Sequence, residues 1–301
     1  MTKQAVSRKA GRPFSYACHD RPAPATTRFA PSPTGHLHLG HVFSAHLAWR
    51  RARDTGGRFL LRHEDIDPDR CRPAYAEAIE ADLRWLGLNW DGPVVRQSER
   101  LTLYRACLDD LCRRGLLYPC FCSRAEIRRE IEGAANAPHG PDGAPLYPGT
   151  CRALPPAERA ARLAAGTPHA WRLDMAHALT RAPALTFVEE DQGEIRACPE
   201  GFGDVILARR DAPASYHLCV THDDAACGIT LVTRALDLKP ATHLHRLLQH
   251  LMGWPTPRYA HHRLITDEAG ARLSKRDHAP TIRALRAAGA TASDVLRQAQ
   301  V

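Results

Sequence analysis

The stretch RFAPSPTGHLHLGHVFSAHLAWRRARDTGGRFLLRHEDIDPDR, residues 28–70, decides the fold. Strand-forming residues, turn formers and an apolar pattern at helical spacing follow one another within it. The predicted elements are a strand at 26–30, a turn at 31–35, a helix from about His41 to before Gly56, and a strand at 59–62. A strand–turn–helix–strand unit indicates an open α/β sheet, which binds ligands where strands end and a helix begins.

Composition sets broad limits on the class of protein. The chain has 301 residues, 44% of them hydrophobic and 25% charged, which is typical of a soluble globular protein. Its formal net charge of +8 favours phosphate-bearing partners without identifying one. No apolar run is long enough to cross a membrane, and the ten cysteines follow no disulfide framework. We therefore expect a cytoplasmic protein with no membrane partner.

Periodicity predicts further elements along the chain. Helices are expected at 75–86, 100–114, 155–166 and 242–253, with one or two short ones within 282–300. Strands are expected at 170–174, 185–190, 201–210, 215–220 and 229–233. The pair Asp223–Asp224 then falls in a turn between the last two strands, and residues 1–25 form a mobile basic extension.

Three cysteines gather around a Pro/Gly-rich loop. Cys120 and Cys122 precede it, and Cys151 follows it together with Tyr147. Thiolates are the usual ligands of structural zinc, but the Cys-x-Cys spacing is tighter than usual and tyrosine is a rare fourth ligand. Buried thiols are also common core residues, so the residues alone leave a zinc site and three core cysteines equally open.

Two short motifs are suited to binding phosphates. His38, Gly40 and His41 lie at the predicted helix start, where imidazoles can donate to phosphate oxygens and glycine permits close approach. Near the end, RLSKR at 272–276 places Lys275 among arginines. Taken singly, the histidines are also credible as surface residues, and an isolated basic run is usually a solvated loop. Neither a P-loop nor a G-x-G-x-x-G motif is present.

Taken together and in order, the motifs resemble class I aminoacyl-tRNA synthetases of the glutamyl type. HLGH at 38–41 is similar to the HIGH signature and RLSKR at 272–276 to the KMSKS loop, while RFAPSPTG and RHEDID resemble the glutamyl branch. Within that branch, YPCFCSR, YPGTCR, SYHL and TRALDL resemble the glutamyl-Q tRNA(Asp) synthetase family. The resemblance covers about residues 26–279.

This resemblance implies an α/β fold with a Rossmann-type parallel sheet, an inserted zinc-containing α+β subdomain and a short helical C-terminal region. The expected organisation is a basic extension at 1–25, the first half of the catalytic domain at 26–114, a zinc-binding, acceptor-type insertion at 115–200, the second half at 201–240, and a helical region with the KMSKS-like loop at 241–301.

The resemblance also implies a function and a set of site residues. Family members activate L-glutamate with ATP without tRNA, then attach it to queuosine in the anticodon of tRNA(Asp). The implied ATP-binding residues are His38, Gly40, His41 and Lys275, with Arg272, Leu273, Ser274 and Arg276 completing the motif loop. The implied glutamate-binding residues are Arg28, Ala30, Ser32, Glu64, Tyr216 and Arg234. The implied ligands of one structural zinc are Cys120, Cys122, Tyr147 and Cys151, and magnesium is expected to accompany ATP.

Two alternatives to that function remain. A truncated glutamyl-tRNA synthetase would charge a tRNA 3′ end, but the short tail after Arg276 leaves no room for an anticodon-binding region. A catalytically silent tRNA- or amino-acid-binding module has little reason to keep His38, His41, Glu64 and Lys275 together. We expect a monomeric ligase. How tRNA docks, and which arginine binds which carboxylate of glutamate, stay open.

Overall fold

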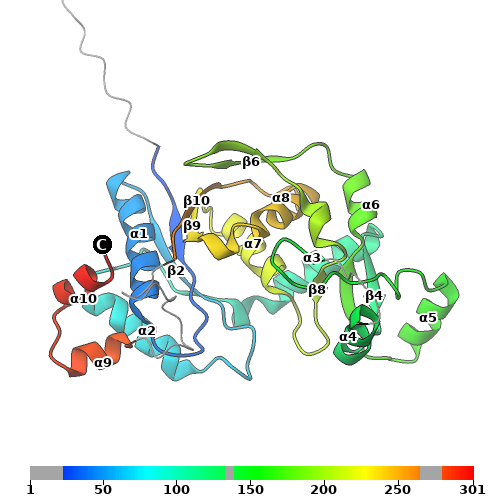
Figure 1. Cartoon of the computed structure of the whole chain (residues 1–301), viewed down its shortest axis with the longest axis horizontal. Coiled ribbons are helices and arrows are strands. Elements are labelled where there is room, and N and C mark those ends of the chain that lie inside the picture. The colour runs from blue at the N-terminus through cyan, green and yellow to red at the C-terminus, as the bar shows by residue number, and fades with distance from the viewer. Residues whose placement is uncertain (1–22, 133–138, 265–279) are drawn as a thin grey trace, which may run out of the picture.

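The computed structural model describes residues 23–132, 139–264 and 280–301 (Figure 1). The predicted N-terminal extension lies almost wholly outside these ranges, and the basic motif at 272–276 lies entirely outside them. The described α-helices are α1 (Leu39–Asp54), α2 (Pro73–Trp85), α3 (Leu101–Arg113), α4 (Arg124–Glu132), α5 (Pro156–Ala164), α6 (Met175–Thr180), α7 (Tyr216–Ala226), α8 (Ala241–Met252), α9 (Ile282–Ala287) and α10 (Ala292–Gln298). Short 3₁₀ helices are η1 (Gln97–Arg100), η2 (Pro199–Phe202) and η3 (Leu236–Leu238).

The strands form three sheets. They are β1 (Thr27–Phe29), β2 (Phe59–His63), β3 (Val95–Arg96), β4 (Leu117–Cys120), β5 (Ala170–Leu173), β6 (Thr186–Glu189), β7 (Gly193–Arg196), β8 (Ile206–Ala208), β9 (Leu231–Ala235) and β10 (Arg258–His262). The sheet orders are β1-β2-β3, β7-β6-β10-β9 and β4-β5-β8.

A parallel sheet forms the centre of the fold. β1 pairs with β2 and β2 with β3, all parallel, and β9 pairs with β10 in parallel over five residues. The backbone N–H groups of Thr230 and Leu231 both donate to the Thr26 carbonyl, which connects the start of β9 to the start of β1. The predicted α/β class with a parallel sheet is confirmed.

Helix α1 covers this sheet because its apolar residues repeat at helical spacing. Val42, Ala45, Ala48 and Ala52 are buried in one core cluster with residues of β2. Ile282 of α9 and Val295 of α10 belong to the same cluster, and Figure 1 shows these helices grouped with α1 and α2 at one end of the molecule.

The opposite end is antiparallel. β4 pairs with β5 and β5 with β8, and α4, α5 and α6 lie around this sheet (Figure 1). The hairpin β6–β7 instead returns to the central part of the fold, where β6 pairs in parallel with β10. The strand predicted at 201–210 was too long: η2 occupies its start and only Ile206–Ala208 is extended.

The strand predicted at 215–220 is wrong, because this segment begins helix α7. The Ser215 side chain accepts a hydrogen bond from the Leu218 N–H at 3.4 Å and so caps the helix. The run Leu218–Thr221 is buried throughout, since α7 is covered on several sides, and such a continuous run is as typical of a buried strand as of a buried helix. Asp223 and Asp224 therefore lie on a helix, and the predicted turn there is wrong as well.

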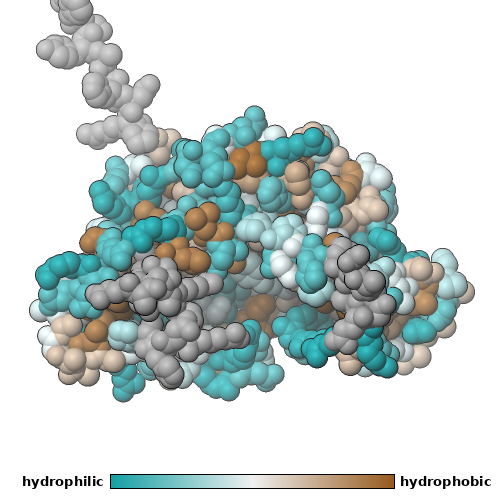
Figure 2. Space-filling model, in the orientation of Figure 1, coloured by the Kyte–Doolittle hydropathy of each residue, from teal (hydrophilic) through white to brown (hydrophobic). Residues whose placement is uncertain are grey.

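The face of the molecule seen in Figure 2 is mainly hydrophilic. Figure 2 shows apolar residues on the visible face only as scattered patches among polar ones. Within the described ranges, no helix is both long and apolar enough to cross a membrane.

Candidate active site

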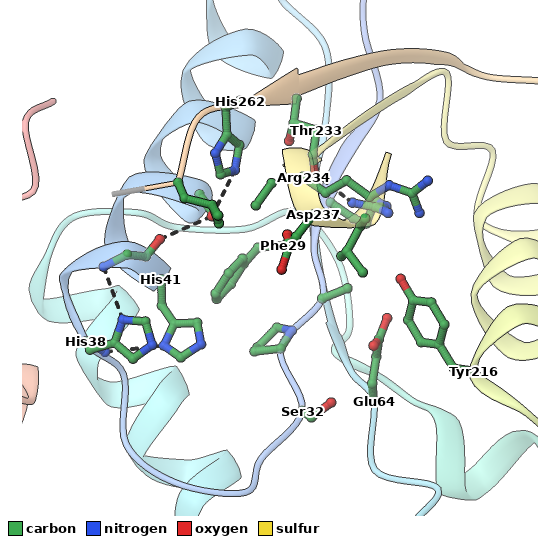
Figure 3. Close-up of a pocket in the computed structure, with 18 of the residues that line it drawn as sticks. Phe29, Ser32, His38, His41, Glu64, Tyr216, Thr233, Arg234, Asp237 and His262 are labelled. Atoms are coloured by element: carbon green, nitrogen blue, oxygen red, sulfur yellow. Dashed lines mark hydrogen bonds between the residues drawn. The ribbon is translucent and has the colours of Figure 1, made fainter. Parts of the chain in front are cut away.

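One cavity of about 460 Å³ lies where the central strands end and α1 begins. Its walls come from the ends of β1, β2 and β9 and from the first turns of α1 and α7 (Figure 3). The cavity brings together these residues singled out from the sequence: Arg28, Ala30, Ser32, His38, Gly40, His41, Glu64, Tyr216 and Arg234. Lys275 and its neighbours lie outside the described residues.

His38 and His41 form the N-terminal cap of α1. The His38 Nδ1 atom accepts from the Gly40 N–H at 3.2 Å, and the His41 Nδ1 atom accepts from the His38 N–H at 3.3 Å. The two rings lie with centroids 3.7 Å apart. Because both Nδ1 atoms accept, each neutral ring carries its proton on Nε2. Both imidazoles therefore present an N–H donor beside the positive end of a 16-residue helix.

Arg28 is held by an acid that sequence reasoning missed. The Arg28 Nε and NH2 groups donate to the two carboxylate oxygens of Asp224 on α7 at 3.0 and 3.3 Å, and NH1 donates to the Thr233 carbonyl at 3.1 Å. Burial raises the pKa of the Asp224 carboxyl, but Arg28 and Arg62 outweigh it and hold that pKa below its ordinary value. Asp224 is thus a buried carboxylate that orients Arg28.

Arg62 connects the same acid to Glu64. Its NH1 donates to Asp224 at 2.6 Å and its NH2 to Glu64 at 3.3 Å, and only 2% of its surface is exposed. Burial raises the pKa of Glu64, an effect that Arg62 and Arg28 partly offset. Figure 3 shows the Glu64 carboxylate and the Tyr216 hydroxyl facing the same space. The cavity therefore offers a carboxylate and a phenol beside the two cations Arg28 and Arg234.

Arg234 is held by three uncharged side chains. Its Nε donates to His261 at 3.1 Å, its NH1 to His245 at 3.3 Å and its NH2 to Thr242 at 2.7 Å. Burial, reinforced by Arg234, keeps the pKa of His245 well below its ordinary value. A guanidinium has five N–H donors. With these three used among the described residues, one N–H remains on each terminal nitrogen, which suits a bidentate carboxylate.

The three cysteines that the sequence offers as zinc ligands lie together at the end of β4. The sulfur atoms of Cys120, Cys122 and Cys151 lie within 4.8 Å of one another. The Tyr147 hydroxyl lies 3.5 Å from the Cys122 sulfur and accepts from the Cys151 N–H at 2.8 Å. Three soft sulfurs and one oxygen on a single centre form a donor set that suits zinc. Part of the intervening loop, residues 133–138, lies outside the described ranges.

Comparison with known proteins gives the family. The family described as class I tRNA synthetases (E and Q), catalytic domain, matches residues 24–299. A glutamyl-Q tRNA(Asp) synthetase of Rhodobacter capsulatus is 50% identical over 289 residues, covering 90% of this chain and 98% of that protein. The chain belongs to the glutamyl-Q tRNA(Asp) synthetase family. The resemblance inferred from the motifs is confirmed, and so is the prediction that the chain is a synthetase-type ligase.

Other members of the wider class agree with this placement. A glutamyl-Q tRNA(Asp) synthetase of Nocardia farcinica is 48% identical, with 89% of this chain and 81% of that protein covered. A glutamate tRNA ligase of Elizabethkingia meningosepticum, solved in complex with its amino acid, superposes with a TM-score of 0.71 at 32% identity over 85% of this chain. The chain spans about half of that ligase, 52% of its length. A class I synthetase catalytic domain with a Rossmann-like sheet is thereby established.

The sequence motifs gave no role to four residues that hold the charged side chains of the cavity, namely Arg62, Asp224, His245 and His261. One signal was available for Asp224. Two adjacent acids within the mostly apolar run LCVTHDDAAC require cations if that run is buried, and Arg28, Arg62 and Arg100 supply them. No comparable signal existed for His245 or His261 in a chain with 17 histidines.

Proposed function

We propose that this chain activates L-glutamate with ATP in the absence of tRNA and then transfers the glutamyl group to the queuosine base of tRNA(Asp). The observation that carries the proposal is that one cavity, of about 460 Å³, joins two buried arginines and Glu64 to the imidazoles at the start of α1. Glutamate has two carboxylates and one ammonium group. Arg28 and Arg234 supply one cation for each carboxylate, and Glu64 supplies the anion for the ammonium group.

The first step is the attack of a glutamate carboxylate oxygen on the α-phosphorus of ATP. A new O–P bond forms, the bond to the β-phosphate oxygen breaks, and pyrophosphate leaves. Such a transfer depends on positioning and on neutralising charge. His38 and His41 bind the phosphates through Nε2–H, and Gly40 lets adenosine approach the helix. Lys275 of the motif loop neutralises the departing pyrophosphate, and magnesium accompanies ATP.

The second step transfers the glutamyl group to a hydroxyl of the queuosine cyclopentenediol, with AMP as the leaving group. The relatives named glutamyl-Q tRNA(Asp) synthetase at 40–50% identity support this acceptor over a tRNA 3′ end. The enzyme acts in the cytoplasm as a monomer.

The cysteine cluster serves a structural zinc ion in this proposal. Cys120, Cys122, Tyr147 and Cys151 would hold it, so all four positions are filled by protein and none is left for a reacting water. The ion would fasten the segment around 115–200, which we treat as an insertion between the two halves of the catalytic domain. It takes no part in the chemistry.

A transfer assay tests the proposal and separates it from its alternatives. Labelled glutamate and ATP are supplied with tRNA(Asp) that contains or lacks queuosine, and each RNA is also used with its 3′-terminal CCA removed. Label that requires queuosine and survives CCA removal supports the proposal. Label on tRNA(Glu) that requires the CCA end indicates a truncated glutamyl-tRNA synthetase. Glutamate binding without any label indicates a silent module.

A further inference from the structure

Arg234 is connected to the hairpin β6–β7 by a short chain of buried side chains. In the parallel pairing of β9 with β10, His261 lies directly opposite Arg234, and in that of β10 with β6, Tyr259 lies opposite Glu189. The His261 ring accepts from the Arg234 Nε–H at Nε2, 3.1 Å away. Its Nδ1 atom lies 2.6 Å from the Glu189 Oε2 atom. A residue of the hairpin thus reaches the cavity through one imidazole.

The protons of this chain of contacts are fixed by chemistry. The Nε of an arginine always carries hydrogen, so the His261 Nε2 atom must be the acceptor. In the neutral ring the hydrogen is then on Nδ1, which donates to Glu189 Oε2. The other Glu189 oxygen, Oε1, accepts from the His261 backbone N–H at 2.8 Å. Both oxygens of Glu189 therefore act as acceptors, and only a carboxylate can provide two.

Burial makes this arrangement rigid. The side chains of Glu189 and His261 are each 1% exposed. Burial and the nearby Arg234 guanidinium lower the pKa of His261 to about 4, so the ring is neutral at neutral pH. Since water does not compete for these contacts, the tautomer of His261 sets the direction in which Arg234 can donate.

We propose that Glu189 is a positioning residue for the amino-acid site: by holding His261 as its Nδ1–H tautomer, it orients the Arg234 guanidinium toward a substrate carboxylate. The inference rests on the proposed function, in which Arg234 binds a carboxylate of glutamate. It assigns the hairpin β6–β7, which contributes no residue to the wall of the cavity, an indirect part in binding the amino acid.

The variant Glu189→Gln should change the tautomer of His261. The backbone N–H of His261 can only donate, so the amide oxygen of the new side chain must face it. The amide NH2 then faces Nδ1, which turns Nδ1 into an acceptor and moves the ring hydrogen to Nε2. Two donors, His261 Nε2–H and Arg234 Nε–H, now face each other, and Arg234 must turn away. An amide behind a catalytic histidine imposes the wrong tautomer in the same way.

The first measurement does not depend on Glu189→Gln. Long-range ¹H–¹⁵N NMR of the histidine rings of the full chain reports each tautomer, with His261 assigned from the signal that disappears in His261→Gln. We expect the Nδ1–H form in the unmodified protein. The Nε2–H form there would overturn the inference, whether or not Glu189→Gln folds.

The second measurement is glutamate-dependent ATP–pyrophosphate exchange. For Glu189→Gln we expect the KM for glutamate to rise about tenfold, equivalent to about 1.4 kcal/mol, with the KM for ATP unchanged within about twofold. Glu189→Asp, which keeps the carboxylate, should recover most of the loss. The matched control is Glu194→Gln on β7, the same change at an exposed residue that bonds to Thr186, and it should behave like the unmodified protein.

The outcomes separate the inference from the function on which it rests. An unmodified protein without glutamate-dependent exchange refutes the proposed function, while the tautomer measurement still stands by itself. Normal exchange in the unmodified protein with an unchanged KM in Glu189→Gln overturns the inference alone. An equal rise in the KM values for glutamate and ATP also overturns it, because a general structural defect would then explain the loss.

Discussion

Asp224→Asn is the most informative perturbation of the amino-acid site. Asp224 accepts from Arg28 at 3.0 and 3.3 Å and from Arg62 at 2.6 Å, and both arginines are buried, 6% and 2% exposed. Removing one partner of a buried ion pair costs about 3–5 kcal/mol. Asparagine keeps one acceptor oxygen, so we expect the lower end, about 3 kcal/mol.

That loss of stability can be converted into a decrease of the melting temperature, Tm. An unfolding entropy of about 2.1 cal/mol/K per residue gives this 301-residue chain about 0.6 kcal/mol/K, so about 3 kcal/mol lowers Tm by about 5 °C. In the variant, of the two acids that bond to Arg62, only Glu64 can still neutralise it. Arg62 therefore draws the Glu64 carboxylate away from the substrate ammonium group. We expect the KM for glutamate to rise about tenfold.

Thermal unfolding and ATP–pyrophosphate exchange measure the two effects. Asp110→Asn is the matched control: its ion pairs with Arg113 and Arg114 are at the surface, where such pairs contribute about 0–1 kcal/mol. Adding Arg62→Met to Asp224→Asn removes one of the two buried cations that lose the charge of Asp224, and it should restore part of the Tm. A variant with unchanged Tm and unchanged KM would refute the assignment of Asp224 as the acid that organises the site.

Three further perturbations test other parts of the molecule. Burial lowers the pKa of His217 and of His261 to about 4, whereas an unfolded histidine titrates near 6.5, so the unfolded chain binds more protons between these values. The free energy of unfolding should therefore fall by on the order of 2 kcal/mol per histidine from pH 7 to pH 5, and a urea midpoint that does not move would contradict this. Cys151→Ser should contain less zinc, measured by elemental analysis, and should loosen the cluster around Cys120 and Tyr147. The control Cys198→Ser changes an exposed cysteine outside the cluster and should keep its metal. Equal metal content in the two variants would refute the site. Lys275→Ala should greatly slow ATP–pyrophosphate exchange yet leave glutamate binding by calorimetry unchanged, and normal exchange would exclude the assigned role.

Local patterns were sufficient to predict β1, α1 and β2 around the cavity, but not α7. The turn formers before His38, the apolar spacing of α1 and the strand after Gly57 each depend on residues close together in the chain. The residues that the family resemblance marks as candidates for binding glutamate and phosphate lie within short motifs at the ends of elements, and those in the described ranges line one cavity. Helix α8 was predicted nearly to the residue, since its apolar stripe is regular and Gly253 ends it in a left-handed conformation.

The side chains behind the cavity could not be predicted in this way. Asp224 meets Arg28 across 196 positions of sequence, and His261 meets Glu189 across 72. Such pairs are determined by how α7 and the hairpin β6–β7 pack, and no local pattern encodes that packing. The error at 215–220 has a related cause: a segment covered on several sides loses the one-sided periodicity that distinguishes a helix from a strand.

The long span between Arg28 and Asp224 also bears on synthesis of the chain. A ribosome that has made β1 and β2 has produced two arginines whose acid, on α7, has not yet been translated, and β9 and β10 follow later still. Contacts between residues so far apart in sequence form late and slow folding. Until α7 emerges, the segment from β1 to β2 holds two cations whose buried acid is missing, so this part of the cavity cannot reach its final arrangement. A pause in translation between β2 and α7 would therefore prolong exposure of this half-formed surface to chaperones and proteases.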